Sequence, residues 1–278
     1  MKTIFGKTVM GLAVAASLGF ASSSVMAQSF PDFVVNEAVV AGAGANQFTA
    51  DKLTGNYVEV ITFNDSGAFN VSLKFQAGQF VANDGNTPVG SQLGSFTANQ
   101  YQLYALYQAS GTTTVSGGTT TFNVAPGGSL RLFSDANSDT VFGQPANGAT
   151  AWTTTNTSDD VLFATGVPIS GAGTLTPGLS TCSAGGGNGI NCGSFGNNTT
   201  FNLTTAGSAY FVSPNPFYNI SFQSGQLNNF TAAGTQVING SLDVIFNRNA
   251  VPEPSSVALL GLGLAGLILG RRRNKKQA

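Results

Sequence analysis

The segment from residue 57 to residue 75 places large apolar side chains at the two-residue period of a β-strand, in two halves that a polar turn separates. In its second half, every other residue is large and apolar: Phe69, Val71, Leu73 and Phe75. Polar residues stand between them: Asn70, Ser72 and Lys74. Successive strand residues point to opposite faces, so this pattern predicts a strand with its apolar set directed inward.

The first half, residues 57–63, predicts a second strand that is joined to the first by a turn. Here the acid Glu59 shares a face with Tyr57, Ile61 and Phe63. The residues between the two strands, 64–67, are Asn, Asp, Ser and Gly, which favour turns. The two segments therefore predict an antiparallel hairpin.

Segments of the same type recur along the chain and are separated by residues rich in Gly, Asn and Ser. They are residues 121–124, 130–133, 160–163, 217–222 and 242–246. Residues 101–108 also fit a helical face, but their aromatic content favours a strand. This organisation predicts an all-β fold, an antiparallel β-sandwich of jelly-roll or immunoglobulin-like type, with phenylalanines between its sheets.

We expect one such domain over residues 28–250, flanked by an N-terminal signal helix and a C-terminal transmembrane helix. Within the domain, residues 171–198 are rich in glycine and are expected to form a loop or insertion.

The N-terminal segment has the three parts of a secretory signal peptide. Lys2 and Lys7 are followed by an apolar run over residues 9–20 and by small or apolar residues up to Ala27. This order predicts export, with cleavage between Ala27 and Gln28. A buried N-terminal helix is the alternative, which the order of the three parts disfavours.

The segment 251–278 consists of a short motif, an apolar run and a basic tail. The motif is Val251, Pro252, Glu253 and Pro254; the apolar run extends from Val257 to Leu269, and Arg271, Arg272 and Arg273 follow it. This run predicts a transmembrane helix of minimal length, with the arginines on the cytoplasmic side. Residues 261–266 match the pattern G-x-G-x-x-G, but no acidic residue follows, so the glycines indicate a membrane helix rather than a nucleotide site.

This order of motif, apolar helix and arginines resembles the PEP-CTERM sorting signal of Gram-negative bacteria. The resemblance implies processing near Pro252–Pro254 by an exosortase, a transpeptidase-like membrane enzyme. The protein would be anchored transiently in the inner membrane and would then reach the cell surface or the extracellular matrix. Proteins of this class usually accompany exopolysaccharide gene clusters, so the resemblance implies exopolysaccharide as a partner.

Three segments of the body are similar to the flocculation-associated PEP-CTERM proteins: residues 30–33, 50–59 and 101–107. That similarity implies a secreted or surface protein that promotes cell aggregation within an exopolysaccharide biofilm matrix. It carries no catalytic residues to this chain.

The charge of the body excludes one class of partner. Residues 28–250 hold four basic residues and eleven acidic ones, a net charge of −7. Such a body cannot neutralise phosphates, so we expect no nucleic acid partner. The chain has no His, which excludes the usual Ser-His-Asp and Cys-His nucleophiles. Paired carboxylates for glycoside hydrolysis remain open, but no motif supports them, and we expect no enzyme.

The two cysteines, Cys182 and Cys192, lie close together in the sequence of a chain that is predicted to be exported. This setting favours a structural disulfide. A metal or redox pair is the alternative, and the absence of His makes a zinc site improbable.

An alternating acidic segment offers a weak calcium hypothesis. Asp135, Asn137 and Asp139 match the first half of an EF-hand loop, but Thr140 and Ala146 break the pattern. An Asx-rich turn is the alternative. The adjacent pair Asp159 and Asp160 indicates an acidic turn before a strand, because neighbouring strand residues face opposite sides.

Four aromatic residues support an alternative function, a carbohydrate-binding module. Tyr101, Tyr104, Tyr107 and Trp152 combine flat apolar rings with polar edges, which suits stacking on sugars. Burial in the core is the competing interpretation.

Overall fold

The computed structural model describes residues 30–94, 100–182, 189 and 191–247. The predicted signal peptide with its cleavage site, the Pro-Glu-Pro motif, the transmembrane run and the arginine tail all lie outside the described residues. Among the described residues, no helix combines the length and the apolar character that crossing a membrane requires.

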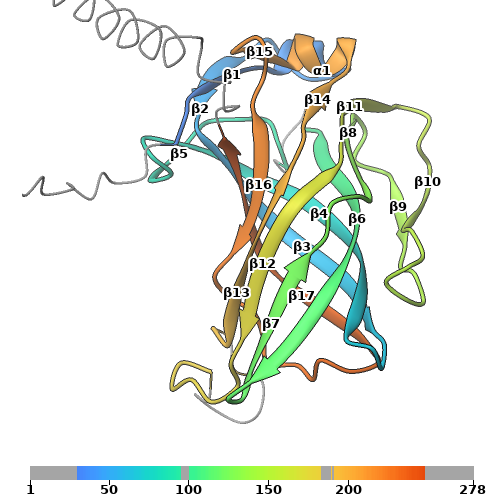
Figure 1. The fold of residues 1–278 in the computed structure, drawn as a ribbon. Coiled ribbons are helices and arrows are strands. Elements are labelled where there is room, and N and C mark those ends of the chain that lie inside the picture. Colours follow the sequence, from blue (N-terminus) through green and yellow to red (C-terminus); the bar gives the residue numbers. More distant parts are fainter. Residues whose placement is uncertain (1–29, 95–99, 183–188, 190, 248–278) are drawn as a thin grey trace, which may run out of the picture.

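Long antiparallel strands form a closed barrel (Figure 1). In order around the barrel, they are β3 (Lys52–Phe63), β4 (Ala68–Ala82), β6 (Gln102–Ser116), β7 (Thr119–Val124), β12 (Pro168–Leu175), β13 (Gly193–Thr199), β16 (Asn219–Ser224) and β17 (Thr235–Asn247). β17 pairs with β3 and β4 pairs with β6, so the ring has no free edge. Toward one end, β8 (Ser129–Asp135), β11 (Asp160–Gly166) and β14 (Asn202–Leu203) extend the sheet beside β6.

The all-β antiparallel prediction is confirmed, but the sandwich prediction is wrong, because one barrel-like sheet takes the place of two stacked sheets. Both architectures bury one face of every strand, so their sequence alternation is the same. Closure depends on the pairing of β3 with β17, which lie at opposite ends of the domain sequence. That pairing leaves no local signal in the sequence.

The predicted hairpin of residues 57–75 is confirmed as β3 and β4. Their register runs from Phe63 opposite Phe69 to Lys52 opposite Val81. The strand prediction for the segment 101–108 is confirmed for residues 102–108, which lie in β6, and Tyr101 directly precedes this strand.

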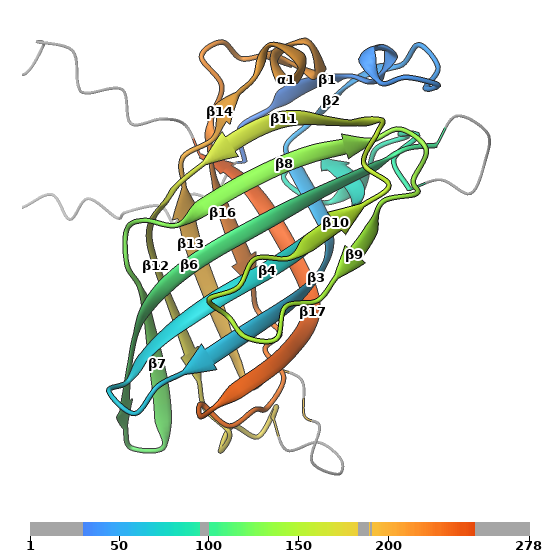
Figure 2. The same ribbon diagram turned by 90° about the vertical axis from the view of Figure 1, so that its right-hand side faces the viewer.

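One end of the barrel is capped. The cap consists of a small sheet and two short helices (Figures 1 and 2): β1 (Phe33–Asn36), β2 (Gln47–Ala50), β15 (Phe211–Ser213), the 3-10 helix Glu37–Val39 and α1 (Thr205–Tyr210). Aromatic rings fill the space beneath it; the centroids of Phe33 and Phe246 are 4.3 Å apart, and those of Phe211 and Phe217 are 5.1 Å apart. Aromatic rings therefore fill most of the capped end, where a small apolar cavity of about 20 Å³ remains beside Phe201, Phe211 and Phe246.

A separate hairpin covers part of the outer wall. β9 (Val141–Gly143) and β10 (Thr153–Thr155) lie over β3, β4 and β6, as Figure 2 shows, and the two-residue β5 (Thr87–Pro88) pairs with the end of β4. The indole N–H of Trp152 donates to the carbonyl of Ser72 at 3.2 Å. Ser72 and Val60, which point away from the barrel interior, are consequently buried.

The glycine-rich segment 171–198 is a loop only in its middle part, because both of its ends belong to strands, which corrects the sequence interpretation. Four of its nine glycines lie in β12 and β13, and residues 176–192 connect these strands. A Cβ at Gly173 would lie 2.9 Å from the Cβ of Phe195 on the adjacent strand. Glycine is used here for close approach, which composition cannot distinguish from flexibility. A disulfide joins Cys182 and Cys192 within the connection.

We expect Gly111→Ala to destabilise the barrel. A Cβ at Gly111 in β6 would lie 2.1 Å from the carbonyl oxygen of Asn123 and 2.5 Å from the ring of Phe69. Neither neighbour can move without breaking strand pairing or core packing, so the free energy of unfolding should fall by roughly 3 kcal/mol. Urea unfolding of the oxidised protein measures this change. Gly90→Ala, at a site with no atom within 4 Å, is the matched control, and equal losses in both variants would contradict the prediction.

Candidate functional site

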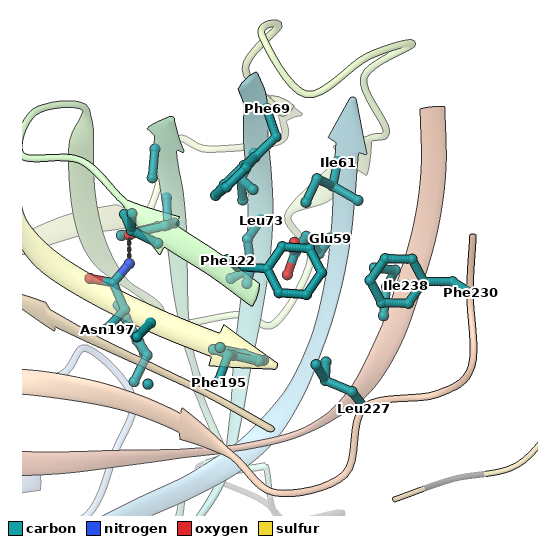
Figure 3. A pocket seen from close by; sticks show the side chains of 18 residues that line it. Glu59, Ile61, Phe69, Leu73, Phe122, Phe195, Asn197, Leu227, Phe230 and Ile238 are labelled. Atoms are coloured by element: carbon teal, nitrogen blue, oxygen red, sulfur yellow. Dashed lines mark hydrogen bonds between the residues drawn. The ribbon is translucent and has the colours of Figure 1, made fainter. Parts of the chain in front are cut away.

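The half of the barrel away from the cap contains a partly enclosed cavity (Figure 3). Strands on all sides of the ring contribute to its wall, and so does the connection between β16 and β17, residues 225–234. The volume is about 70 Å³, counted as room for the centres of water molecules. The lining is largely apolar, with small residues on three strands: Ala109, Ala172, Gly173 and Gly196. These small residues leave the space that the phenylalanines fill at the capped end.

Phe69, Phe122 and Phe230 line this cavity, and Phe63 packs against all three of them. Phe63, Phe69 and Phe122 come from β3, β4 and β7, and Phe230 comes from the 225–234 connection. Their ring centroids are 6.0–6.3 Å apart where they contact one another. Deeper in the barrel, the Phe222 ring contacts both Tyr107 at 5.5 Å and Phe75 at 6.4 Å. Phe222 thereby separates the cavity from the packed core.

The 225–234 connection is tied to the disulfide. The amide of Cys192 donates to the carbonyl of Leu227 at 2.9 Å, and the amide of Leu227 donates to the carbonyl of Gly193 at 3.1 Å. The amide of Asn229 donates to Gly189 at 3.0 Å. These bonds hold Leu227 and Phe230 in place beside the cavity.

Glu59 is the one charged side chain of the cavity lining among the described residues (Figure 3). The alternation of β3 directs it inward with Tyr57 and Ile61, as the sequence predicts. No hydrogen bond or ion pair within the described residues reaches its carboxylate. Burial raises the pKa of Glu59 to about 7. Burial, and after it the charge of Glu59, also raises the pKa of Tyr57 and of Tyr107.

Asn197 on β13 adds a second polar group to the cavity wall. Its Nδ2 donates to the hydroxyl of Tyr107, as the dashed line in Figure 3 shows. Its Oδ1 is buried and has no hydrogen-bond partner among the described residues. Asn197 lies in the segment that the sequence predicted to be a loop, so its inward direction could not be read from the pattern. The signal for Glu59 was present, an acid on an otherwise apolar strand face.

The buried Glu37, in the cap, shows how this chain satisfies a structural carboxylate. The Glu37 carboxylate accepts bonds from Asn46 Nδ2 and Ser91 Oγ, both at 2.6 Å, and from the Tyr101 hydroxyl at 2.8 Å. Gln92 adds its amide N–H at 2.9 Å and its Nε2 at 3.2 Å. With five donors, this carboxylate holds the cap to the barrel. Within the described ranges, no such set of donors surrounds the Glu59 carboxylate in the cavity, which marks it as a candidate for ligand contact.

The acidic side chains that lie together in the structure differ from those that the sequence predicted as calcium ligands. The Asp135 carboxylate accepts hydrogen bonds from the backbone amides of Asp139 at 3.2 Å and Thr140 at 3.0 Å. These bonds form the Asx-rich turn. Asn137 likewise contributes its backbone amide, which donates to Asp159 at 2.7 Å. In these hydrogen bonds, Asn137 and Asp139 take part through their backbone amides, so the three side chains predicted from the sequence are not shown to meet at one point.

Instead, Asp135 lies beside Asp159 and Asp160, with carboxylate oxygens within 4.8 Å of one another. Asp159 precedes β11, so the alternation rule that separated it from Asp160 does not apply there. The Asp160 carboxylate accepts a hydrogen bond from the Tyr104 hydroxyl at 2.5 Å. Burial is the main cause that raises the pKa of Asp160. These three acids could hold a divalent cation, and calcium binding stays a prediction.

The four aromatics of the predicted sugar platform are core residues. Their exposed fractions are 0% for Tyr101, 1% for Tyr104, 4% for Tyr107 and 8% for Trp152. Tyr101 contacts Tyr210 under the cap, and Trp152 covers the outer wall. Buried rings cannot stack on a polymer, so the carbohydrate-binding hypothesis loses the residues on which it was built.

We expect Glu59→Gln to stabilise the protein at pH 8 and much less at pH 5. The pKa of Glu59 is raised from 4.5 to about 7 by folding, so its contribution to stability is lost as the pH rises through about 7. Removing the acid should raise the free energy of unfolding by on the order of 3 kcal/mol at pH 8 and by less than about 1 kcal/mol at pH 5.

Urea unfolding at the two pH values measures the difference. The exposed turn variant Asp65→Asn is the control and should change little at either pH. An equal gain for Glu59→Gln at both pH values would show that Glu59 is not held in an apolar environment.

Comparison with known proteins gives one match. Residues 250–273 match the PEP-CTERM protein-sorting motif, which covers the predicted motif, apolar run and arginines. No curated protein and no solved structure matches the chain. The motif implies targeting to an exosortase, export and a transiently membrane-anchored tail before surface display. The chain therefore combines a closed antiparallel barrel with a PEP-CTERM protein-sorting motif.

Proposed function

We propose that this protein is a non-enzymatic surface or matrix protein that associates with exopolysaccharide and promotes cell aggregation. The sorting motif at residues 250–273 carries the proposal, because it directs the barrel to the outside of the cell. The barrel then acts as a displayed module, and its outer surface is the part that meets the matrix.

The outer surface of the barrel suits a neutral polar partner. Along β6, Thr112, Thr114 and Ser116 are exposed, and the neighbouring strand β7 exposes Asn123. Hydroxyl and amide groups can exchange hydrogen bonds with water for hydrogen bonds with sugar hydroxyls at little net cost. With a net charge of −7 over residues 28–250, the body should be repelled by strongly anionic polymers at low salt. The proposal therefore favours a neutral or weakly charged exopolysaccharide.

The barrel also restricts how aggregation can occur. An open sheet could join cells by pairing strands edge to edge, but the closed ring offers no unpaired strand among its members. Cell aggregation would instead proceed through the polymer that the displayed barrels contact. Salt and soluble polysaccharide, rather than protein concentration alone, should then govern aggregation.

We expect substitution of the motif to abolish both surface display and aggregation. In a strain that lacks the gene, the full chain should restore aggregation, whereas a variant with Pro252, Glu253 and Pro254 changed to Ala should not. The reason is that the exosortase would no longer process the tail, so the barrel would stay at the inner membrane. Ser255→Ala combined with Ser256→Ala is the matched control next to the motif.

Sedimentation of cells measures aggregation, and the intact mass of the protein from outside the cells reports its ends. A mass that starts at Gln28 and ends near Pro252–Pro254 is expected. Normal aggregation in the deletion strain would refute the aggregation function. Normal display of the motif variant would refute the sorting role independently.

A further inference from the structure

We propose that the barrel cavity binds a slender amphiphile with an ammonium head group, with its chain among the phenylalanines and its head against Glu59. This binding site goes beyond surface display and aggregation, and it rests on the barrel alone.

The unpartnered carboxylate is the first support. Glu59 faces the cavity without a hydrogen-bond donor or a cation among the described residues, whereas the buried Glu37 has five donors. A carboxylate in apolar surroundings is costly unless a partner compensates for the lost water. An ammonium group supplies an opposite charge and three N–H donors at once.

The cations of the described barrel are engaged elsewhere, so none of them compensates Glu59. Lys52 pairs with Asp243 at 3.1 Å. On the outer wall, Nζ of Lys74 lies 4.5 Å from the centroid of the Phe142 ring. Cζ of Arg131 lies 4.8 Å from the centroid of the Phe133 ring. No cation of the described residues therefore compensates ionised Glu59, and a bound ammonium group would fill that role.

The shape of the cavity selects a narrow ligand. A volume of about 70 Å³ for water centres corresponds to roughly five water molecules, which an unbranched chain of about six carbons could replace. The surrounding rings of Phe69, Phe122 and Phe230 would contact that chain. The free Oδ1 of Asn197 can accept a hydrogen bond from the head group, which adds a second polar contact.

Proton linkage gives the site a pH signature. The titratable groups near the head group are Glu59 and Tyr57 on β3 and Tyr107 on β6, and both tyrosines stay protonated because their pKa values are raised. An ammonium pairs with ionised Glu59, whose pKa is about 7. Affinity should therefore be full at pH 8 and should fall by roughly 30-fold at pH 5.5.

The test is calorimetric titration of the full chain with hexylamine at pH 8. We expect saturable binding at one site, with 1-hexanol at least tenfold weaker and hexanoate weaker still, because only the amine carries the complementary charge. Glu59→Gln should weaken hexylamine binding at least tenfold, whereas the exposed control Asp65→Asn should leave it unchanged. Repeating the titration at pH 5.5 should show the loss of affinity in the unchanged protein and a smaller loss in Glu59→Gln.

Three results would overturn the proposal. The first is absence of hexylamine binding at pH 8. The second is equal affinity for hexylamine and hexanol, which would show an apolar cavity without an ammonium site. The third is unaltered hexylamine binding by Glu59→Gln.

Thermal unfolding guards against a misfolded variant. Glu59→Gln should keep a cooperative transition, and hexylamine should raise its transition temperature less than it raises that of the unchanged protein. None of these results depends on whether the protein promotes aggregation.

Discussion

The pairing of β17 with β3 closes the sheet, and the rest of the structure depends on that closure. It runs from Thr235 opposite Thr62 to Ile245 opposite Lys52, along almost the whole of β3. Without it, two long strands would expose their backbone groups, and one apolar face of the sheet would meet water. With it, every inward side chain of the ring faces a common interior. The interior can then be divided into a packed part and a hollow part.

Side-chain size makes that division. Near the cap, Phe33, Phe201, Phe211, Phe217 and Phe246 contact one another and leave little space. Toward the other end, glycines and alanines on β6, β12 and β13 replace large residues, and a cavity remains. The disulfide contributes by fixing the connection that carries Leu227 and Phe230 beside this cavity. The stable end and the hollow end of the barrel thus rest on the same strands.

The two inward carboxylates have opposite environments. Glu37 is surrounded by donors and strengthens the attachment of the cap, whereas Glu59 weakens the barrel when it is ionised. A destabilising group at a cavity wall is typical of sites where binding compensates for the cost. Surface display through the sorting motif would place that cavity in contact with the small molecules of the matrix. The proposed functions of the tail and of the barrel are therefore compatible but independent.

The sequence by itself determined the features that depend on near neighbours. The alternation in residues 57–75 was sufficient for the hairpin, for the inward direction of Phe69 and Phe75, and for the place of Glu59 on the apolar face. The order of motif, apolar run and arginines was sufficient for the sorting class. Each of these signals lies within one strand, one turn or one short segment.

Only the tertiary structure decided the features that depend on distant pairs. Closure into a barrel rather than a sandwich required β3 to meet β17, and the strand character of residues 171–175 and 193–198 required close approach across Gly173. The meeting of Asp135 with Asp159 and Asp160 required β8 to pair with β11. The cavity required eight strands to bring small residues together around Glu59, whose carboxylate has no hydrogen-bond partner within the described part of the chain. Alternation specifies which face of a strand is buried, but it contains no information about which strand lies opposite.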